Sequence, residues 1–176
     1  MECCLRFNTL IQSIATFALV FSVLQLSWQW CVEASLGRQV IELGVVKPAA
    51  YLANQLTPNI HTYASGTRLV DGSRGGSIRI ANGCDGMETL FLLIAGFVVA
   101  PLSWRMRFLG ALAGVPLVYV LNQARILGLF YAHSNDTDLF DLLHGVVTPV
   151  IMVLSVFAYF YVWLPPSHQT RIAESS

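Results

Sequence analysis

Residues 82–102 read NGCDGMETLFLLIAGFVVAPL, where a polar, glycine-flanked turn gives way to a long apolar run. The run at residues 87–102 predicts an apolar helix. Glycine accepts backbone angles that other residues avoid, so Gly83 and Gly86 permit a sharp turn that presents Cys84. Backbone N–H groups and the dipole at a helix N-terminus favour a thiolate over a thiol. The stretch therefore predicts a reactive cysteine, although a small buried residue beside a turn is the simpler interpretation.

The chain as a whole has the composition of a membrane protein. It has 176 residues, of which 55% are hydrophobic and 11% are charged, whereas a soluble domain has about 25% charged residues. The formal net charge is zero, so nucleic acid is not an expected partner. The four cysteines lack the spacing of a metal site or a disulfide framework. A disulfide between Cys31 and Cys84 is conceivable but would inactivate Cys84 as a nucleophile. We expect neither a metal nor a cofactor.

Apolar runs predict four transmembrane helices, at residues 10–30, 87–102, 108–132 and 142–164. About 20 apolar residues suffice to cross a bilayer, so the second run is short. The first run could be a signal peptide, but its length and weakly charged start favour a retained anchor. Trp28 and Trp30 fit an aromatic belt at the membrane interface. We therefore expect an all-α polytopic membrane protein with one membrane domain over residues 1–176.

The charges of the short loops set the expected orientation. Short basic loops stay in the cytoplasm, so the loop with Arg105 and Arg107 is expected inside. The acidic loop at residues 133–141 then lies outside. Both termini are inside, and residues 31–86 form an extracytoplasmic segment. The basic residues of that segment oppose this orientation, but long loops weigh less than short ones.

The extracytoplasmic segment is too polar to span a membrane. Residues 37–56 have roughly helical apolar spacing that is interrupted at Pro48, which predicts two short amphipathic helices. Two alternating runs, at residues 67–71 and 77–81, are joined by DGSRGG and predict a β-hairpin. The hairpin leads directly into the turn with the cysteine. We expect its free edge to pair with an extended substrate peptide, a common mode of recognition.

Three polar residues meet at the outer surface in this topology. Cys84 precedes the second span, and His144 lies in the first turn of the fourth span. Arg125 lies about 10 Å below the outer end of the third span. An intramembrane charge is costly unless it is paired, so Arg125 is a candidate functional residue. The three groups suit acyl transfer: His144 would move protons to and from Cys84, and Arg125 would stabilise an oxyanion or hold a substrate carbonyl.

Neighbouring polar residues support such a site. Asn122 lies one helical turn before Arg125 and shares its face. Asp141 lies one turn before His144 and could orient it, as the third member of a triad does. In the alternative interpretation, Arg125 forms a structural ion pair with Glu88 or Asp141. A metal site is disfavoured, because a cationic guanidinium beside it would oppose metal binding.

The order of these motifs resembles that of a known family. A cysteine, then Asn-x-x-Arg-Ile, then a histidine, each near the end of a transmembrane helix, is similar to the pattern of the exosortases and archaeosortases. NGCDG resembles the nucleophile motif of that family, LNQARI at residues 121–126 its arginine motif, and LLHGVVTP at residues 142–149 its histidine motif. Asp85 replaces a small polar residue, and a carboxylate there would raise the pKa of Cys84. The resemblance covers roughly residues 65–164, and the short chain resembles the compact exosortase H type.

The resemblance implies a membrane-embedded cysteine protease or transpeptidase. Substrates of the family end in a short recognition motif, a transmembrane helix and a basic cluster, and they would be cut at the outer face of a bacterial cytoplasmic (inner) membrane. Cys84 would be the nucleophile, and lipid and the tailed substrate would be the partners. Two other functions stay open. One is a non-catalytic scaffold in which Arg125 and His144 only pair helices. The other is a small transporter, against which the apolar inner halves of the spans count.

Overall fold

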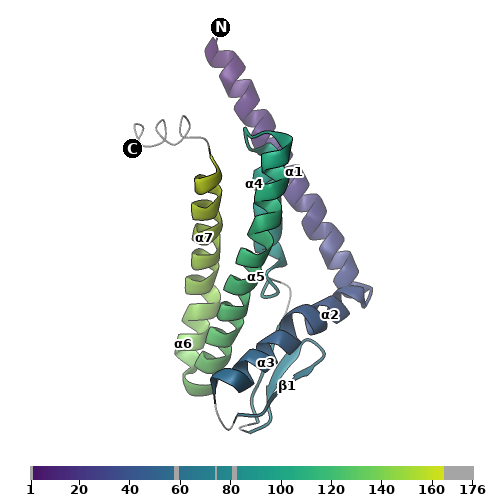
Figure 1. The fold of residues 1–176 in the computed structure, drawn as a ribbon, viewed down its shortest axis with the longest axis vertical. Helices are drawn as coiled ribbons and strands as arrows, with labels where there is room; N and C mark the ends of the chain where they lie inside the picture. The colour runs from purple at the N-terminus through teal and green to yellow at the C-terminus, as the bar shows by residue number, and fades with distance from the viewer. Residues whose placement is uncertain (1, 58–59, 74, 81–82, 165–176) are drawn as a thin grey trace.

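The computed structural model describes residues 2–57, 60–73, 75–80 and 83–164, and helices dominate it (Figure 1). Helix α1 spans Glu2–Glu33 and α4 spans Met87–Val99. Helix α5 spans Trp104–Asn135. The last helical run consists of α6 (Thr137–Leu142), a π-helical turn η2 (Leu143–Val147) and α7 (Thr148–Trp163). Helices α4, α5 and α7 pack against one another, and α1 packs against α4.

Three of the described helices are long and apolar enough to cross a membrane. They are Asn8–Glu33, Trp104–Asn135 and Thr137–Trp163. Helix α4 has 13 residues, or about 20 Å, which is shorter than the hydrocarbon core of about 30 Å. Pro101 forces Ala100 into an extended conformation, so α4 ends at Val99 and not at residue 102. The predicted polytopic helical architecture is confirmed, whereas three helices, not four, have spanning length.

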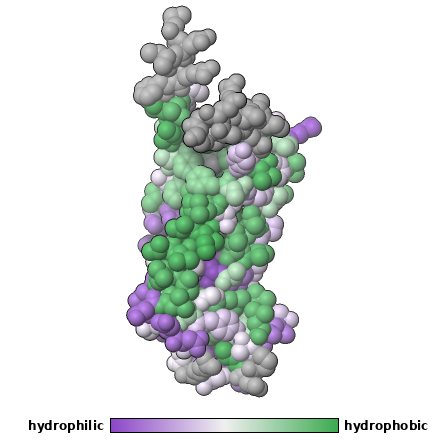
Figure 2. All heavy atoms as spheres, turned by 90° about the vertical axis from the view of Figure 1, so that its left-hand side faces the viewer, coloured by the Kyte–Doolittle hydropathy of each residue, from purple (hydrophilic) through white to green (hydrophobic). Residues whose placement is uncertain are grey.

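The helices leave a broad apolar surface for lipid. Figure 2 shows the face with α6 and α7 as a mainly hydrophobic band, with hydrophilic residues gathered towards the end that carries α6. Large apolar side chains of the long helices are exposed there and elsewhere, among them Leu19, Val120, Leu154 and Phe157. A hydrophobic exterior of this kind suits hydrocarbon and not water.

Glycines bring α4 and α5 into close contact. Gly110 and Gly114 lie one turn apart in α5, the small-xxx-small spacing of packed membrane helices. A β-carbon at Gly110 would lie 2.3 Å from the Phe97 ring, and one at Gly114 would lie 2.4 Å from Leu93 Cδ2. Tyr159 of α7 donates a hydrogen bond of 2.7 Å to the Gly110 carbonyl. The short α4 is therefore packed closely against α5, and Tyr159 joins α7 to α5 beside it.

The segment after α1 begins with one continuous helical run. It consists of α2 (Leu36–Ile41), the π-helical turn η1 (Glu42–Val46) and α3 (Lys47–Leu56). The predicted break at Pro48 is wrong, because the π-helical turn before it accommodates the proline within the continuous run. The N–H of Lys47 bonds to the carbonyl of Glu42, five residues back, and the wider turn makes room for the ring.

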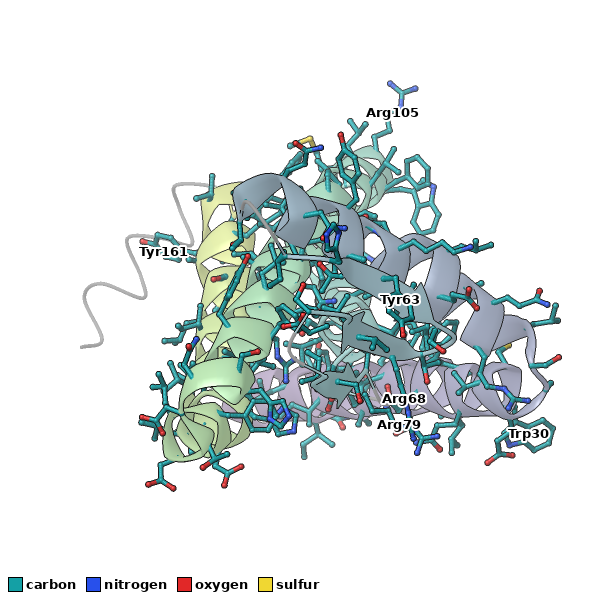
Figure 3. The ribbon with its side chains drawn as sticks, turned by 90° about the horizontal axis from the view of Figure 1, so that it is seen from below. Trp30, Tyr63, Arg68, Arg79, Arg105 and Tyr161 are labelled. Atoms are coloured by element: carbon teal, nitrogen blue, oxygen red, sulfur yellow. The ribbon has the colours of Figure 1, made fainter. Side chains whose placement is uncertain are left out.

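A three-stranded antiparallel sheet follows in the order β1-β2-β3. Its strands are β1 (Thr62–Ser65), β2 (Arg68–Asp71) and β3 (Ser77–Arg79). Strands β2 and β3 form the predicted hairpin, with Arg68 opposite Arg79, while residue 81 lies outside the described residues. Figure 3 shows Tyr63, Arg68 and Arg79 on this sheet, seen from below. The prediction missed β1, which Asn54 of α3 holds through hydrogen bonds of 2.8 Å to the N–H and the carbonyl of Thr62.

Both connections between the long helices are tighter than predicted. The expected acidic loop at residues 133–141 is helical except at Asp136, whose carboxylate accepts hydrogen bonds from the N–H groups of Asp138 and Leu139. The expected basic loop is the first turn of α5. Arg107 there donates to the carbonyls of Val98 and Leu102 and so caps the end of α4.

The two ends of the bundle differ. The first turns of α1, the α4–α5 connection and the last turn of α7 lie at one end (Figure 1). The sheet, α3 and α6 lie at the other end. A buried cluster joins the sheet and the α2–α3 run to α5, and its members include Val46, Leu69, Ile80, Cys84 and Ile126. Cys84 therefore sits where the sheet and the α2–α3 run meet the long helices.

Candidate active site

The turn before α4 presents Cys84 between two glycines with positive φ angles. Gly83 has φ 91° and Gly86 has φ 83°, a region that residues with side chains rarely adopt. A β-carbon at Gly86 would also lie 2.8 Å from Cγ of Asn122. Helix α4 begins at Met87, as predicted, and Cys84 stands three residues before it. Residue 82 of the motif lies outside the described residues.

The structure brings the three predicted residues together. Sγ of Cys84 lies 3.6 Å from Nδ1 of His144 and 3.7 Å from Nη2 of Arg125. These distances suit hydrogen bonds that involve sulfur. The three side chains come from the turn before α4, from η2 and from α5, so the site depends on the packing of the whole bundle.

Arg125 is turned towards the loop and not towards an acid. Its Nη1 donates a hydrogen bond of 3.0 Å to the carbonyl of Gly83. Within the part of the chain that the structure describes, no ion pair joins Arg125 to Glu88 or Asp141, and Nε is buried without a partner. The ion pair of the structural alternative is therefore not formed.

His144 is held by an aromatic ring. Phe140, four residues earlier, stacks on the imidazole with ring centroids 5.5 Å apart and an interplanar angle of 3°. Asp141 is exposed and forms no hydrogen bond with His144 among the described residues, so its role in orienting the ring stays a prediction. Sequence reasoning missed Phe140, although its spacing from His144 is that of helical neighbours.

Of the predicted supporting residues, Asp85 lies in the turn that carries Cys84, and Asn122 lies against Gly86 of that turn. Asp85 is 6% exposed and accepts hydrogen bonds from Nε1 of Trp28 at 2.7 Å and from the N–H of Met87 at 3.2 Å. Asn122 is 2% exposed, and its Oδ1 has no partner. Sequence reasoning also missed Trp28, because its partner lies 57 residues away.

The electrostatics of Cys84 differ from the expectation. Burial raises the pKa of the Cys84 thiol, Arg125 lowers it, and Asp85 and Glu88 raise it further. The net direction is upward, so the predicted shift in favour of the thiolate is wrong. The physical reason is that the thiol is buried and stands too far from the start of α4 to gain from the helix dipole, which acts within the first turn. The surroundings of Cys84 therefore favour the thiol over the thiolate.

Cavities flank the turn on two sides. One cavity of about 220 Å³ lies between α1, α4 and α7, and polar groups of Gly83, Glu88 and Arg125 line it together with apolar side chains such as Phe21, Leu92 and Met152. A second cavity of about 220 Å³ is lined by Asp85, Asn122 and residues of η1. The first adjoins Arg125, whose guanidinium contacts the thiol.

The described cysteines form no disulfide. Cys31 and Cys84 are both free thiols among the described residues. Within the same residues, no three His, Cys, Asp or Glu side chains are grouped in a way that could hold a metal ion. The site is thus built from a thiol, an imidazole and a guanidinium.

Comparison with known proteins gives one match. Residues 9–161 match the family model described as transmembrane exosortase (Exosortase_EpsH). The match includes Cys84, Arg125 and His144. No curated protein and no solved structure matches the chain.

Proposed function

Since this chain belongs to the transmembrane exosortase family, whose members are generally cysteine transpeptidases, we propose that it cleaves the C-terminal sorting signals of exported proteins with Cys84 as nucleophile. The observation that carries the proposal is the position of the Cys84 sulfur, which lies within hydrogen-bond range of both His144 and Arg125. A base and a fixed positive charge on one thiol are the requirements of acyl transfer.

The first half of the reaction forms a thioester. His144 takes the proton of the Cys84 thiol, and the sulfur attacks the scissile carbonyl carbon. The carbonyl oxygen becomes an oxyanion, which the guanidinium of Arg125 stabilises. The carbon–nitrogen bond then breaks, and His144 returns the proton to the leaving amine. The raised pKa of Cys84 makes this base necessary, because little thiolate exists before substrate binds.

The second half releases the product. An acceptor amine or a water molecule attacks the thioester carbon, and His144 accepts its proton. A second oxyanion forms and collapses, the carbon–sulfur bond breaks, and the proton returns to the sulfur. Amine attack gives transfer, and water attack gives hydrolysis.

Substrate and membrane position follow the same proposal. The substrate is a membrane-anchored protein with a short motif, a transmembrane helix and a basic cluster. The enzyme is a multi-pass protein of the bacterial inner membrane with both termini inside and the site outside. The free edge of β3 lies five residues before Cys84 in the chain and would pair with the extended motif.

The scaffold alternative requires different contacts. A scaffold would use Arg125 to pair helices, but the guanidinium bonds to the nucleophile turn and to no carboxylate among the described residues. A partly buried charge without such a pair lowers stability, so the presence of Arg125 here fits catalysis better.

Co-expression with a tailed substrate tests the proposal. The wild type should shorten the substrate, and Cys84→Ala should leave it intact while inserting normally. Cys31→Ser is the matched control, because that thiol is free and exposed. Cleavage that persists in Cys84→Ala at the wild-type rate would refute the proposal.

A further inference from the structure

Trp28 makes a contact that the proposed mechanism does not use. Its indole Nε1 donates a hydrogen bond of 2.7 Å to Oδ2 of Asp85, the neighbour of Cys84. Trp28 belongs to α1, so this bond joins the first helix to the nucleophile turn. The indole also packs against the buried cluster that includes Cys84. A tryptophan that only marks the membrane interface would need neither contact.

The carboxylate of Asp85 is tied at both oxygens. Oδ2 accepts from Trp28, and Oδ1 accepts from the N–H of Met87, the first residue of α4. The carboxylate thereby connects α1, the turn and α4. Gly83 and Gly86 have no side chains with which to hold the turn. Asp85 is therefore the side chain that fixes the turn to α1 and to the start of α4.

We propose that Trp28 is a positioning residue, whose indole N–H holds Asp85 and thereby the turn that carries Cys84. The arrangement keeps the thiol facing His144 and Arg125. This proposal rests on the proposed function, because positioning matters to the reaction only if Cys84 is the nucleophile.

The hydrogen bond also affects the charge around the thiol. The groups that face Cys84 are Asp85 in its own turn, Glu88 of α4, Arg125 of α5 and His144 of η2. The negative charge of Asp85 opposes formation of the thiolate. A charge-assisted bond from Trp28 draws part of that charge onto the indole. Loss of the donor should therefore make the thiol harder to ionise.

The experiment removes the donor and keeps an aromatic ring. Trp28→Phe is compared with Trp30→Phe, a residue of the same helix that is 76% exposed and whose side chain forms no hydrogen bond with a described residue. Both are made in full-length protein in which every cysteine but Cys84 is serine. The rate of alkylation by iodoacetamide is followed against pH in detergent, and substrate cleavage is measured in parallel.

We expect Trp28→Phe to raise the alkylation midpoint by about half a pH unit, or about threefold less thiolate at neutral pH. Its cleavage rate should fall, and Trp30→Phe should match the parent protein in both measurements. Asp85→Asn keeps an oxygen for the indole and removes the charge, so its midpoint should fall. Adding Trp28→Phe to Asp85→Asn should then leave the midpoint unchanged.

Equal midpoints and equal cleavage in the parent, Trp28→Phe and Trp30→Phe would overturn the proposal. A shift of the same size with and without Asp85→Asn would overturn it too, because the effect would not pass through Asp85. If Trp28→Phe fails to fold, the Asp85→Asn variant decides: an alkylation midpoint equal to that of the parent protein would overturn the proposal. Alkylation needs no substrate, so a shifted midpoint in a protein that never cleaves would contradict the proposed function and leave the role of Trp28 standing.

Discussion

Arg125 brings a positive charge into the apolar bundle without an ion-pair partner among the described residues. Its guanidinium donates to the carbonyl of Gly83 and to the sulfur of Cys84. A charge in such a place is costly unless it serves the site. At the scale of single residues, Arg125 therefore separates two interpretations. If Arg125 is catalytic, its replacement should lower turnover, whereas if it is structural, its replacement should lower the stability of the fold.

Arg125→Lys should insert and fold but lose about 10²–10³-fold in turnover, because a flexible point charge replaces a rigid fork of donors. Arg125→Leu should be inactive yet melt no earlier than the wild type in detergent, since no ion pair is broken. Its Cys84 should also need a higher pH for alkylation, because Arg125 lowers the pKa of that thiol. Turnover, melting temperature and the alkylation profile would be measured together.

Arg105→Lys is the control for these variants, because Arg105 is exposed at the opposite end of α5. A Leu variant that melts early, combined with a Lys variant that cleaves normally, would make Arg125 a structural residue.

The sequence predicted which three polar side chains meet at Cys84, because each stands beside or within an apolar run. It could not predict Phe140 and Trp28 as partners, since an aromatic residue in an apolar helix is expected to pack or to sit at the interface. Of the causes that raise the pKa of Cys84, the sequence predicted the Asp85 carboxylate but not burial, which is the largest. Burial depends on how the sheet and the α2–α3 run fold over the turn.

At the scale of elements, two π-helical turns precede two prolines. In η1 the N–H of Lys47, just before Pro48, bonds five residues back, and in η2 the N–H of Thr148, just before Pro149, does the same. A proline clashes with the preceding turn of a regular helix, and a wider turn relieves the clash. His144 lies within η2, so Pro149 helps to set the direction in which the imidazole points.

Pro149→Ala should let η2 return to a regular α-helix. That change shifts the register by one residue and turns His144 by about a quarter of a turn relative to α7. We expect turnover to fall about tenfold or more, because small misplacements of a catalytic group are costly, while the melting temperature holds or rises. Pro48→Ala, the same change in η1, should affect turnover less. Full activity in Pro149→Ala would show that the π turn does not set the position of His144.

The elements themselves were partly predictable. Alternation gave β2 and β3, but β1 depends on Asn54, which reaches it from α3. The predicted break at Pro48 and the predicted acidic loop failed for a common reason. In each segment a local feature allows a helix to form. A π-helical turn accommodates Pro48, and the carboxylate of Asp136 caps the start of α6.

At the scale of the whole molecule, the bundle has one end with the site and one end without it. Cys31 is exposed near the end of α1 that adjoins α2, and Ser103 is exposed in the α4–α5 connection at the other end. With the remaining cysteines replaced by serine, a membrane-impermeant maleimide should label Cys31 in intact spheroplasts. A single cysteine introduced by Ser103→Cys should be labelled only after the membrane is opened. The reverse pattern would place the site in the cytoplasm.

The polytopic helical architecture was predictable from apolar runs, because lipid-facing helices must be apolar throughout. The number of full spans was not, since Pro101 shortens α4 and its packing against Gly110 and Gly114 depends on α5.

Formation of a thioester on Cys84 is the most direct test of a cysteine transpeptidase. The wild type would be mixed with a tailed substrate, quenched in acid, digested and analysed by mass spectrometry. The Cys84 peptide should carry the acyl part of the substrate, hydroxylamine should release it, and Cys84→Ala should show neither adduct nor cleavage. Cleavage that continues in Cys84→Ala, with no adduct on the wild-type Cys84 peptide, would contradict Cys84 as the nucleophile.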